Sequence, residues 1–158
     1  MAYTIGLDFG TNSVRCLIVD VTSGRELSTV VHEYETGQAG IILDSADHNL
    51  ARQNPADYLK GTEATVKAAI AQAKKAVKSF EPDQIIGVGV DTTGSTPIPV
   101  DKNGTPLSML DEFKNNPNAC AWLWKDHTGH AEAAEITQLA AKERPEYLAK
   151  CGGTYSSE

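Results

Sequence analysis

The segment Ile5–Arg15 constrains the fold of this chain more than any other stretch of its sequence. It begins as an apolar strand, reaches a carboxylate (Asp8) where that strand ends, and turns into a second apolar strand, Val14–Val19. The turn between them offers one glycine, two hydroxyls and one amide: Gly10, Thr11, Asn12 and Ser13. Glycine lets a backbone approach a ligand closely, and hydroxyls with turn N–H groups form a concave set of donors for phosphate. We therefore expect nucleotide phosphates at this turn, against the plainer alternative of a hairpin with a polar turn.

Two charged residues flank this turn, and their expected roles differ. Asp8 repels phosphate, so direct contact between the two is not expected. Because Mg²⁺ keeps several waters and takes one or two carboxylates, Asp8 is instead predicted to hold this metal indirectly, through water. Arg15 lies in the second strand, where pointing at phosphate and pairing within the sheet or with solvent are equally open interpretations.

Composition and charge exclude several classes of partner. The chain has 158 residues, 41% of them apolar and 22% charged, and a formal net charge of -7. This length suits one globular domain with a real core. The negative charge argues against nucleic acid or an anionic membrane surface as a partner, whereas a phosphate ligand needs only local donors. No basic-then-apolar leader precedes the first strand and no apolar run is long enough to span a membrane, so we expect a soluble, cytoplasmic protein.

The cysteines indicate neither a disulfide framework nor a zinc site. Cys16, Cys120 and Cys151 are odd in number and widely spaced, and none belongs to a Cys-x-x-Cys pair. Cys16 falls within a strand pattern, so we expect it to be a small core residue.

Three strands and a long helix are predicted in the first half of the chain. The strands span Tyr3–Asp8, Val14–Asp20 and Glu26–Glu35, and turn signals between them predict consecutive antiparallel pairing. Residues 37–54 have few periodic apolar positions and are predicted to form a loop. A helix then begins at Pro55 with Asn54 as its N-cap. Its apolar face recurs at spacings of three and four and consists of Leu59, Thr62, Val66, Ala69, Ile70, Ala73, Val77 and Phe80.

The second half of the chain begins with an apolar strand. The nearly unbroken run Gln84–Val90 is typical of a strand covered on both faces, and it ends on a carboxylate, Asp91. A further strand is predicted at Pro97–Val100, followed by a turn. Residues Ala119–Ala141 are predicted to be helical, and Pro145–Ala149 to add a short helix.

This order of elements defines an expected fold class. Three antiparallel strands, a helix and then a strand parallel to the first is the order of the ribonuclease-H-like α/β core, on which actin, the Hsp70 ATPase and the hexokinase-type kinases are built. In such a sheet Asp8 and Asp91 lie at the ends of neighbouring parallel strands. Ligands of open α/β sheets bind at these carboxyl ends, so we expect the site there.

Five motifs give the chain a specific resemblance to the FGGY family of carbohydrate kinases. They are Gly6–Arg15, Gly87–Pro97, Asn116–Ala119, Leu123–Thr128 and Gly152–Glu158. The first indicates only a phosphate-binding loop of the superfamily, whereas the second and fourth are more specific and are most similar to members that act on L-ribulose. The resemblance covers essentially the whole chain. It implies that residues 1–158 are the N-terminal part of domain I of such a kinase, without the rest of domain I or the C-terminal ATP-binding domain.

The resemblance implies transfer of the γ-phosphoryl group of ATP to the 5-hydroxyl of L-ribulose, assisted by Mg²⁺. Catalysis of this kind is mostly positioning and charge stabilisation. The residues implied to bind the ATP phosphates are Gly10, Thr11, Asn12, Ser13 and Arg15. Those implied to bind the sugar are Asp91, Thr93, Gly94, Ser95, Thr96, Trp124, Lys125, Asp126 and His127.

Three of these sugar assignments leave alternatives open. Gly94, Ser95 and Thr96 either contact the sugar or form a merely polar turn. Asp91 either contacts the substrate or orients the following turn by accepting backbone N–H groups. The cluster Trp124–His127 either stacks an indole on the sugar, with polar neighbours, or is a helix start with its tryptophan in the core.

In this family the general base and the adenine pocket lie downstream of positions equivalent to Glu158. We therefore expect the isolated chain to have negligible kinase activity. A kinase domain that ends within its own fold exposes apolar surface. The corresponding prediction is self-association, including a homodimer, or disorder near Gly152–Glu158.

Three other functions compete with this interpretation. The first is a kinase of the same family for another sugar or polyol, such as xylulose or glycerol. The second is a two-metal nuclease in which Asp8 and Asp91 hold the metals, although the acidic charge and the hydroxyl-rich turn argue against it. The third is a module that folds without catalysing a reaction.

Overall fold

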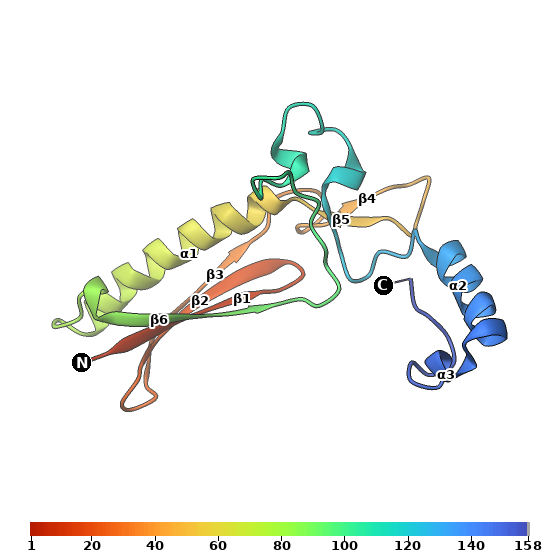
Figure 1. Ribbon diagram of the computed structural model, residues 1–158. Coiled ribbons are helices and arrows are strands. Elements are labelled where there is room, and N and C mark those ends of the chain that lie inside the picture. Colours follow the sequence, from red (N-terminus) through yellow and green to blue (C-terminus); the bar gives the residue numbers. More distant parts are fainter. Residues whose placement is uncertain (158) are drawn as a thin grey trace.

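The computed structural model describes residues 1–157, and its main element is a four-stranded sheet in the order β3-β2-β1-β6 (Figure 1). The strands are β1 (Tyr3–Phe9), β2 (Ser13–Asp20), β3 (Glu26–Glu33) and β6 (Ile85–Thr92). β1 pairs antiparallel with β2 and parallel with β6, and β2 pairs antiparallel with β3. The predicted order of three antiparallel strands and a returning parallel strand is therefore confirmed.

Helix α1 (Pro55–Ala76) lies across β2 and β3 and covers one face of this sheet. Asn54 caps it as predicted, because its side chain accepts the backbone N–H of Ala56. The helix ends at Ala76, before Phe80, since Val77 has an extended backbone. Phe80 nevertheless belongs to the core and packs edge-on against Tyr3, with ring centroids 4.9 Å apart.

Small residues let α1 approach the sheet closely. A Cβ atom on Gly61 would lie 2.5 Å from a methyl group of Val14, so this contact requires glycine. The predicted apolar face is correct at Ala69 and Ala73 but wrong at Leu59, which is 59% exposed. The core formed between helix and sheet consists of Tyr3, Ile5, Cys16, Ile18, Ala69, Ala73 and Phe80.

A second, smaller sheet was not predicted. It has the order β4-β5-β7, with β4 (Ile42–Leu43), β5 (Ala51–Gln53) and β7 (Ala121–Trp122) paired antiparallel. The prediction of a loop over residues 37–54 therefore missed two short strands. One neighbour of β5 is β7, which is far away in the sequence, and strands of two or three residues carry too few positions for an alternation to be recognised.

The helix predicted at Ala119–Ala141 begins only at His130. Residues before it form a 3-10 turn (Pro117–Ala119), then β7, then a turn, because the backbone of this stretch pairs with β5. Helices α2 (His130–Glu143) and α3 (Pro145–Leu148) follow, and Figure 1 shows them at the opposite end of the molecule from β1 and β6. Among residues 1–157 no helix has the length and apolarity that crossing a bilayer requires.

The strand predicted at Pro97–Val100 is also absent from the described residues. Only Val100 makes a bridge, with Pro106, because Pro97 and Pro99 have no N–H to donate to a ladder. The turn after it is as expected, since the carboxylate of Asp101 accepts backbone N–H groups in it. Two further 3-10 turns occupy Pro82–Gln84 and Leu107–Met109.

Strand β6 is exposed, although the sequence predicted cover on both faces. Its side chains Ile86, Val88 and Val90 are 70%, 60% and 62% exposed. The physical reason is that β6 forms the edge of the sheet and α1 packs on β2 and β3 instead. The predicted disorder near Gly152–Glu158 stays a prediction. Residues 152–157 are described, and Glu158 lies outside the described residues.

We predict that the apolar edge strand β6 makes the 158-residue chain self-associate, because unpaired apolar edges add strands from other molecules. Replacing Val88 and Val90 with lysine should shift the chain toward monomer in sedimentation velocity. Val21→Lys, at a similarly exposed valine in the β2–β3 turn, is the matched control and should leave the distribution unchanged. A sharp monomer peak of the unmodified chain at high concentration would contradict the prediction.

Candidate functional site

The turn between β1 and β2 directs its carbonyl groups inward. The carbonyl of Thr11 accepts a bond from Gln53 Nε2 at 2.6 Å, and that of Asn12 accepts the N–H of Tyr34 at 2.9 Å. The carbonyl of Ser13 accepts the N–H of Gly10, also at 2.9 Å. Among residues 1–157, the N–H groups of Thr11 and Asn12 find no acceptor. The turn therefore presents free donors, which is the arrangement an anion needs.

The side chains of this turn are held as well. The amide of Asn12 donates to the carbonyl of Ala39 at 2.7 Å. The hydroxyl of Thr11 accepts the indole N–H of Trp124 at 3.0 Å. Because an indole N–H only donates, the hydroxyl proton of Thr11 remains available for another acceptor. Two of the predicted site segments, far apart in the sequence, thus meet at Thr11.

Three charged residues lie in one row across neighbouring strands. Asp8 is in register with Arg15 on β2 and with Asp91 on β6. Arg15 Nη1 lies 3.4 Å from Asp8 Oδ2, and both side chains are 52% exposed. Side chains alternate along a strand, and Ile5 and Leu7 pack toward α1. The row therefore lies on the opposite, open face of the sheet, at a pocket of about 370 Å³.

Arg15 pairs with Asp8 within the sheet, and its predicted contact with phosphate stays a prediction. Asp91 accepts the N–H of Thr92, the last residue of β6, at 3.0 Å, and both predicted roles of Asp91 stay open.

The turn after β6 carries the second group of predicted residues. Thr93 N–H donates to the carbonyl of Phe9, the last residue of β1, at 3.1 Å, which ties this turn to the start of the β1–β2 turn. The hydroxyls of Thr93 and Thr96 lie 3.2 Å apart. Ser95 has a φ of 51°, a left-handed backbone that is strained for a residue with a side chain. Gly94 faces open space, since a methyl group added to it would meet no atom within 4 Å.

A pocket of about 270 Å³ lies between these two turns. Its walls are mostly apolar and aromatic. They are formed by Phe9, Gly10, Tyr58, Thr92, Thr93, Thr96 and Ile98. The pocket is thus bounded by the β1–β2 turn on one side and the Thr93–Thr96 turn on the other.

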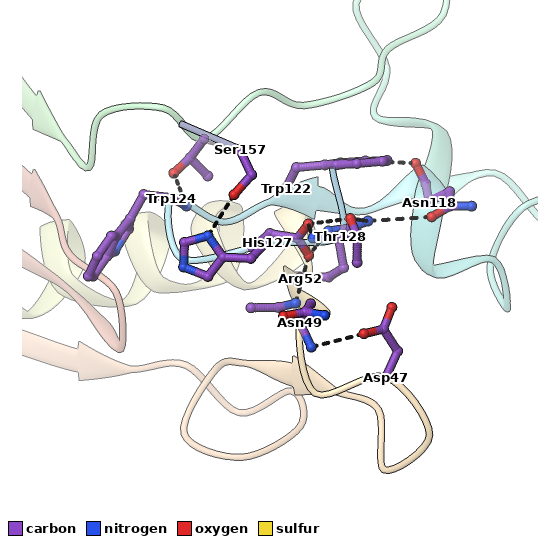
Figure 2. Close-up of polar contacts among 12 residues, drawn as sticks. Asp47, Asn49, Arg52, Asn118, Trp122, Trp124, His127, Thr128 and Ser157 are labelled. Carbon is purple, nitrogen blue, oxygen red and sulfur yellow. Dashed lines mark hydrogen bonds and ion pairs between the residues drawn. The ribbon is translucent and has the colours of Figure 1, made fainter. Parts of the chain in front are cut away.

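The segment Trp124–His127 is a turn and not the start of a helix. Trp124 is 41% exposed, and its backbone N–H donates to the hydroxyl of Thr96 at 3.2 Å. Its indole therefore lies at the mouth of the site, not in the core. His127 Nδ1 lies 2.8 Å from Ser157 Oγ, so the end of the described chain folds back on this turn (Figure 2). Lys125, the residue after Trp124, is half-buried.

Asp126 differs from its three neighbours because it points inward. It is 5% exposed and forms an ion pair with Arg52, a residue that the sequence did not single out. Its carboxylate also accepts the N–H of Ala51 at 2.7 Å and the hydroxyl of Thr128 at 2.5 Å. This carboxylate is saturated by internal donors. Asp126 is therefore not placed to make the sugar contact that was predicted for it.

Arg52 completes this buried cluster (Figure 2). Its guanidinium stacks on the ring of Trp122 at 3.5 Å and is 1% exposed. Burial lowers the pKa of Arg52, but from so high an ordinary value that the group stays charged. Arg52 and Gln53 are buried polar residues in a stretch without periodicity. The only signal near them in the sequence was the helix start that follows at Asn54.

We predict that Asp126→Asn lowers the free energy of unfolding by about 3–5 kcal/mol, because it leaves the buried Arg52 charge uncompensated. Asp8→Asn is the matched control, since the Asp8–Arg15 pair is half exposed and should contribute less than about 1 kcal/mol. Urea unfolding of the two variants measures both values. Equal, small losses would show that the buried pair does not hold this turn.

Comparison with known proteins identifies the family. The model of the FGGY family of carbohydrate kinases, N-terminal domain, matches residues 3–144. A ribulokinase from Vibrio parahaemolyticus is 43% identical over 157 residues, which are 99% of this chain and 27% of that protein. A ribulokinase from Halalkalibacterium halodurans is 36% identical over 160 residues, 99% of this chain and 28% of the relative. The chain thus spans about a quarter of the length of these curated relatives.

Solved structures confirm the fold class. The crystal structure of xylulose kinase from Rhodospirillum rubrum superposes with a TM-score of 0.66 at 19% identity, over 92% of this chain and 24% of that one. Such neighbours have the actin/hexokinase-like fold that the order of elements predicted. Together with the match over residues 3–144, this similarity shows that the chain belongs to the FGGY family of carbohydrate kinases, in the region of its N-terminal domain.

Proposed function

We propose that this chain supplies the phosphate-binding turn and part of the sugar pocket of a cytoplasmic, ATP-dependent kinase that phosphorylates L-ribulose at its 5-hydroxyl. The observation that carries the proposal is the β1–β2 turn, whose carbonyls are bonded inward while the N–H groups of Thr11 and Asn12 have no acceptor among residues 1–157. The choice of L-ribulose is supported by the curated relatives, which are ribulokinases at 43% and 36% identity.

The donors of this turn fit the terminal phosphates of ATP. The N–H groups of Thr11 and Asn12 and the hydroxyls of Thr11 and Ser13 would hold them, and Gly10, whose own N–H donates to Ser13, would let the phosphate approach the backbone. Bonds of this charged kind contribute about 1.5–3 kcal/mol each. When bound, ATP supplies the phosphoryl group and Mg²⁺ neutralises part of its charge. Asp8 is exposed enough to hold the metal through water. Arg15, beside Asp8, adds a positive charge to this face and limits the repulsion between that carboxylate and a phosphate.

The sugar would lie between the two turns that meet at the pocket of about 270 Å³. Hydroxyls of Thr93, Ser95 and Thr96 suit a polyol, and Gly94 lets the substrate approach the backbone. The half-exposed indole of Trp124 offers a face for the sugar ring or chain. Lys125 and His127 would add polar contacts. Asp91 and Asp126 would act indirectly, by holding the turns on which the contacting residues lie.

We further propose that the general base and the adenine pocket belong to regions of the relatives that have no counterpart in this chain, the rest of domain I and the C-terminal ATP-binding domain. The chain alone should therefore have negligible kinase activity. No nucleic-acid or membrane partner is expected.

The proposal predicts that this chain can replace the corresponding quarter of the Vibrio parahaemolyticus ribulokinase. The chimeric enzyme should release ADP with L-ribulose in a coupled assay, and do so faster than with xylulose or glycerol. Asp8→Asn in the chimera should raise the Mg²⁺ concentration needed for half-maximal rate, with little change in the KM for sugar. A folded chimera that prefers xylulose or glycerol would refute the substrate, and one without any phosphorylation would refute the kinase function.

A second prediction concerns Gly94, where an added methyl group meets open space and the backbone φ is unstrained. Gly94→Ala should leave the stability of the chain unchanged but raise the KM for sugar in the chimera about tenfold, since it occupies the space proposed for the substrate. Gly87→Ala is the matched control, because its methyl would meet only an ordinary contact, at 3.8 Å from Thr4 Oγ1. Equal KM values for the two variants would place the sugar elsewhere.

The nuclease alternative is not adopted. Asp8 and Asp91 do lie side by side in register, as that function requires. However, the guanidinium of Arg15 already compensates Asp8 at 3.4 Å, and this cation opposes two divalent ions at the same carboxylates.

A further inference from the structure

One buried side chain, Gln53, and one half-buried side chain, Tyr58, connect the start of α1 to the turn between β1 and β2. The hydroxyl of Tyr58 donates to Gln53 Oε1 at 2.7 Å, and Gln53 Nε2 donates to the carbonyl of Thr11 at 2.6 Å. Gln53 is 1% exposed and is the last residue of β5. Neither Gln53 nor Tyr58 belongs to a motif that carries the family resemblance, so their contact with the turn is a finding of the structure alone.

The direction of each bond in this relay is determined by chemistry. A backbone carbonyl only accepts, so the amide nitrogen of Gln53 must face Thr11 and its oxygen must face Tyr58. Burial raises the pKa of the Tyr58 phenol, which therefore keeps the proton that it donates. The Tyr58 ring is held by edge-on contacts with Phe9 and Tyr34, at centroid distances of 6.1 and 5.4 Å. The relay thus rests on a fixed support.

Holding the Thr11 carbonyl also directs the neighbouring N–H group. In a planar trans peptide, the carbonyl of one residue and the N–H of the next point in opposite directions. A Thr11 carbonyl that points at Gln53 therefore directs the Asn12 N–H away from β5. Among residues 1–157, this N–H has no acceptor. A donor whose direction is set beforehand needs no reorganisation when an anion arrives.

We propose that Gln53 and Tyr58 are positioning residues that hold the Asn12 N–H toward a bound phosphate. This inference rests on the proposed phosphate-binding function of the turn and names the residues that preorganise it. Neither side chain touches the phosphate. Gln53 acts on the Thr11–Asn12 peptide by bonding its carbonyl. Tyr58 acts one step further away, by fixing the orientation of the Gln53 amide.

The test uses the ¹⁵N-labelled 158-residue chain titrated with magnesium tripolyphosphate, followed through the amide signals of Thr11 and Asn12. In the unmodified chain these signals should shift and saturate. Gln53→Met removes the donor at nearly constant size, and Tyr58→Phe keeps the ring but removes the hydroxyl. Each should weaken tripolyphosphate binding about tenfold, the equivalent of one hydrogen bond. Thr65→Val, which removes a buried hydroxyl bond to the carbonyl of Gly61 within α1, is the matched control and should bind within about twofold of the unmodified chain.

The outcomes separate this inference from the function on which it rests. An unmodified chain whose turn signals do not move would overturn both. Unmodified binding that persists undiminished in Gln53→Met and Tyr58→Phe would overturn the positioning role alone. An equal loss in Thr65→Val would also overturn it, because general destabilisation would then account for the effect. If Gln53→Met unfolds, Tyr58→Phe decides the question, since it retains the ring contacts.

Discussion

The short strand β5 is the constraint on which the site depends, because its three residues bond in two directions. On one side the N–H of Ala51 and the guanidinium of Arg52 hold the carboxylate of Asp126, which anchors the turn that carries Trp124. On the other side Gln53 holds the carbonyl of Thr11 in the phosphate turn. The two halves of the proposed site therefore take their relative position from a single strand. A buried ion pair adds little net stability, but it tolerates few other arrangements once formed. Its value here is geometric.

A second connection closes this arrangement from the solvent side. The indole of Trp124 donates to the hydroxyl of Thr11, and its backbone N–H donates to Thr96. Thr11 is thus held at its carbonyl by Gln53 and at its hydroxyl by Trp124. A phosphoryl transfer that relies on positioning gains most when the groups facing the phosphate and those facing the acceptor hydroxyl cannot move independently. In this chain the common element of both groups is one threonine.

Sequence patterns within single elements correctly predicted the longer strands and the first helix. Strands β1 to β3 follow from apolar runs separated by turn residues, and α1 follows from its cap at Asn54 and a period of three to four. The sequence could not reveal β5 and β7, because each is too short to show a period and their partner lies in the other half of the chain. For the same reason the family motifs located Thr11 and Trp124 but not Gln53 or Arg52. The exposure of β6 was missed because an apolar run shows what a strand can bury, and not which elements pack on it; α1 packs on β2 and β3.

The two faces of the main sheet have different roles: one packs against α1 and forms the core, and the other is open and carries the charged residues of the proposed site. Along β1, residues such as Ile5 face α1 and form the core, whereas Asp8 alternates to the open face. Charges on that face need no compensation from the core, so they remain half exposed and accessible to a charged ligand. The turns at the carboxyl ends of β1 and β6 extend the same division, since Phe9 and Tyr58 pack beneath the pocket while the turn N–H groups face outward. Substitutions on the open face should thus change binding without unfolding the chain, and Gln53 is the exception because it belongs to both the core and the site.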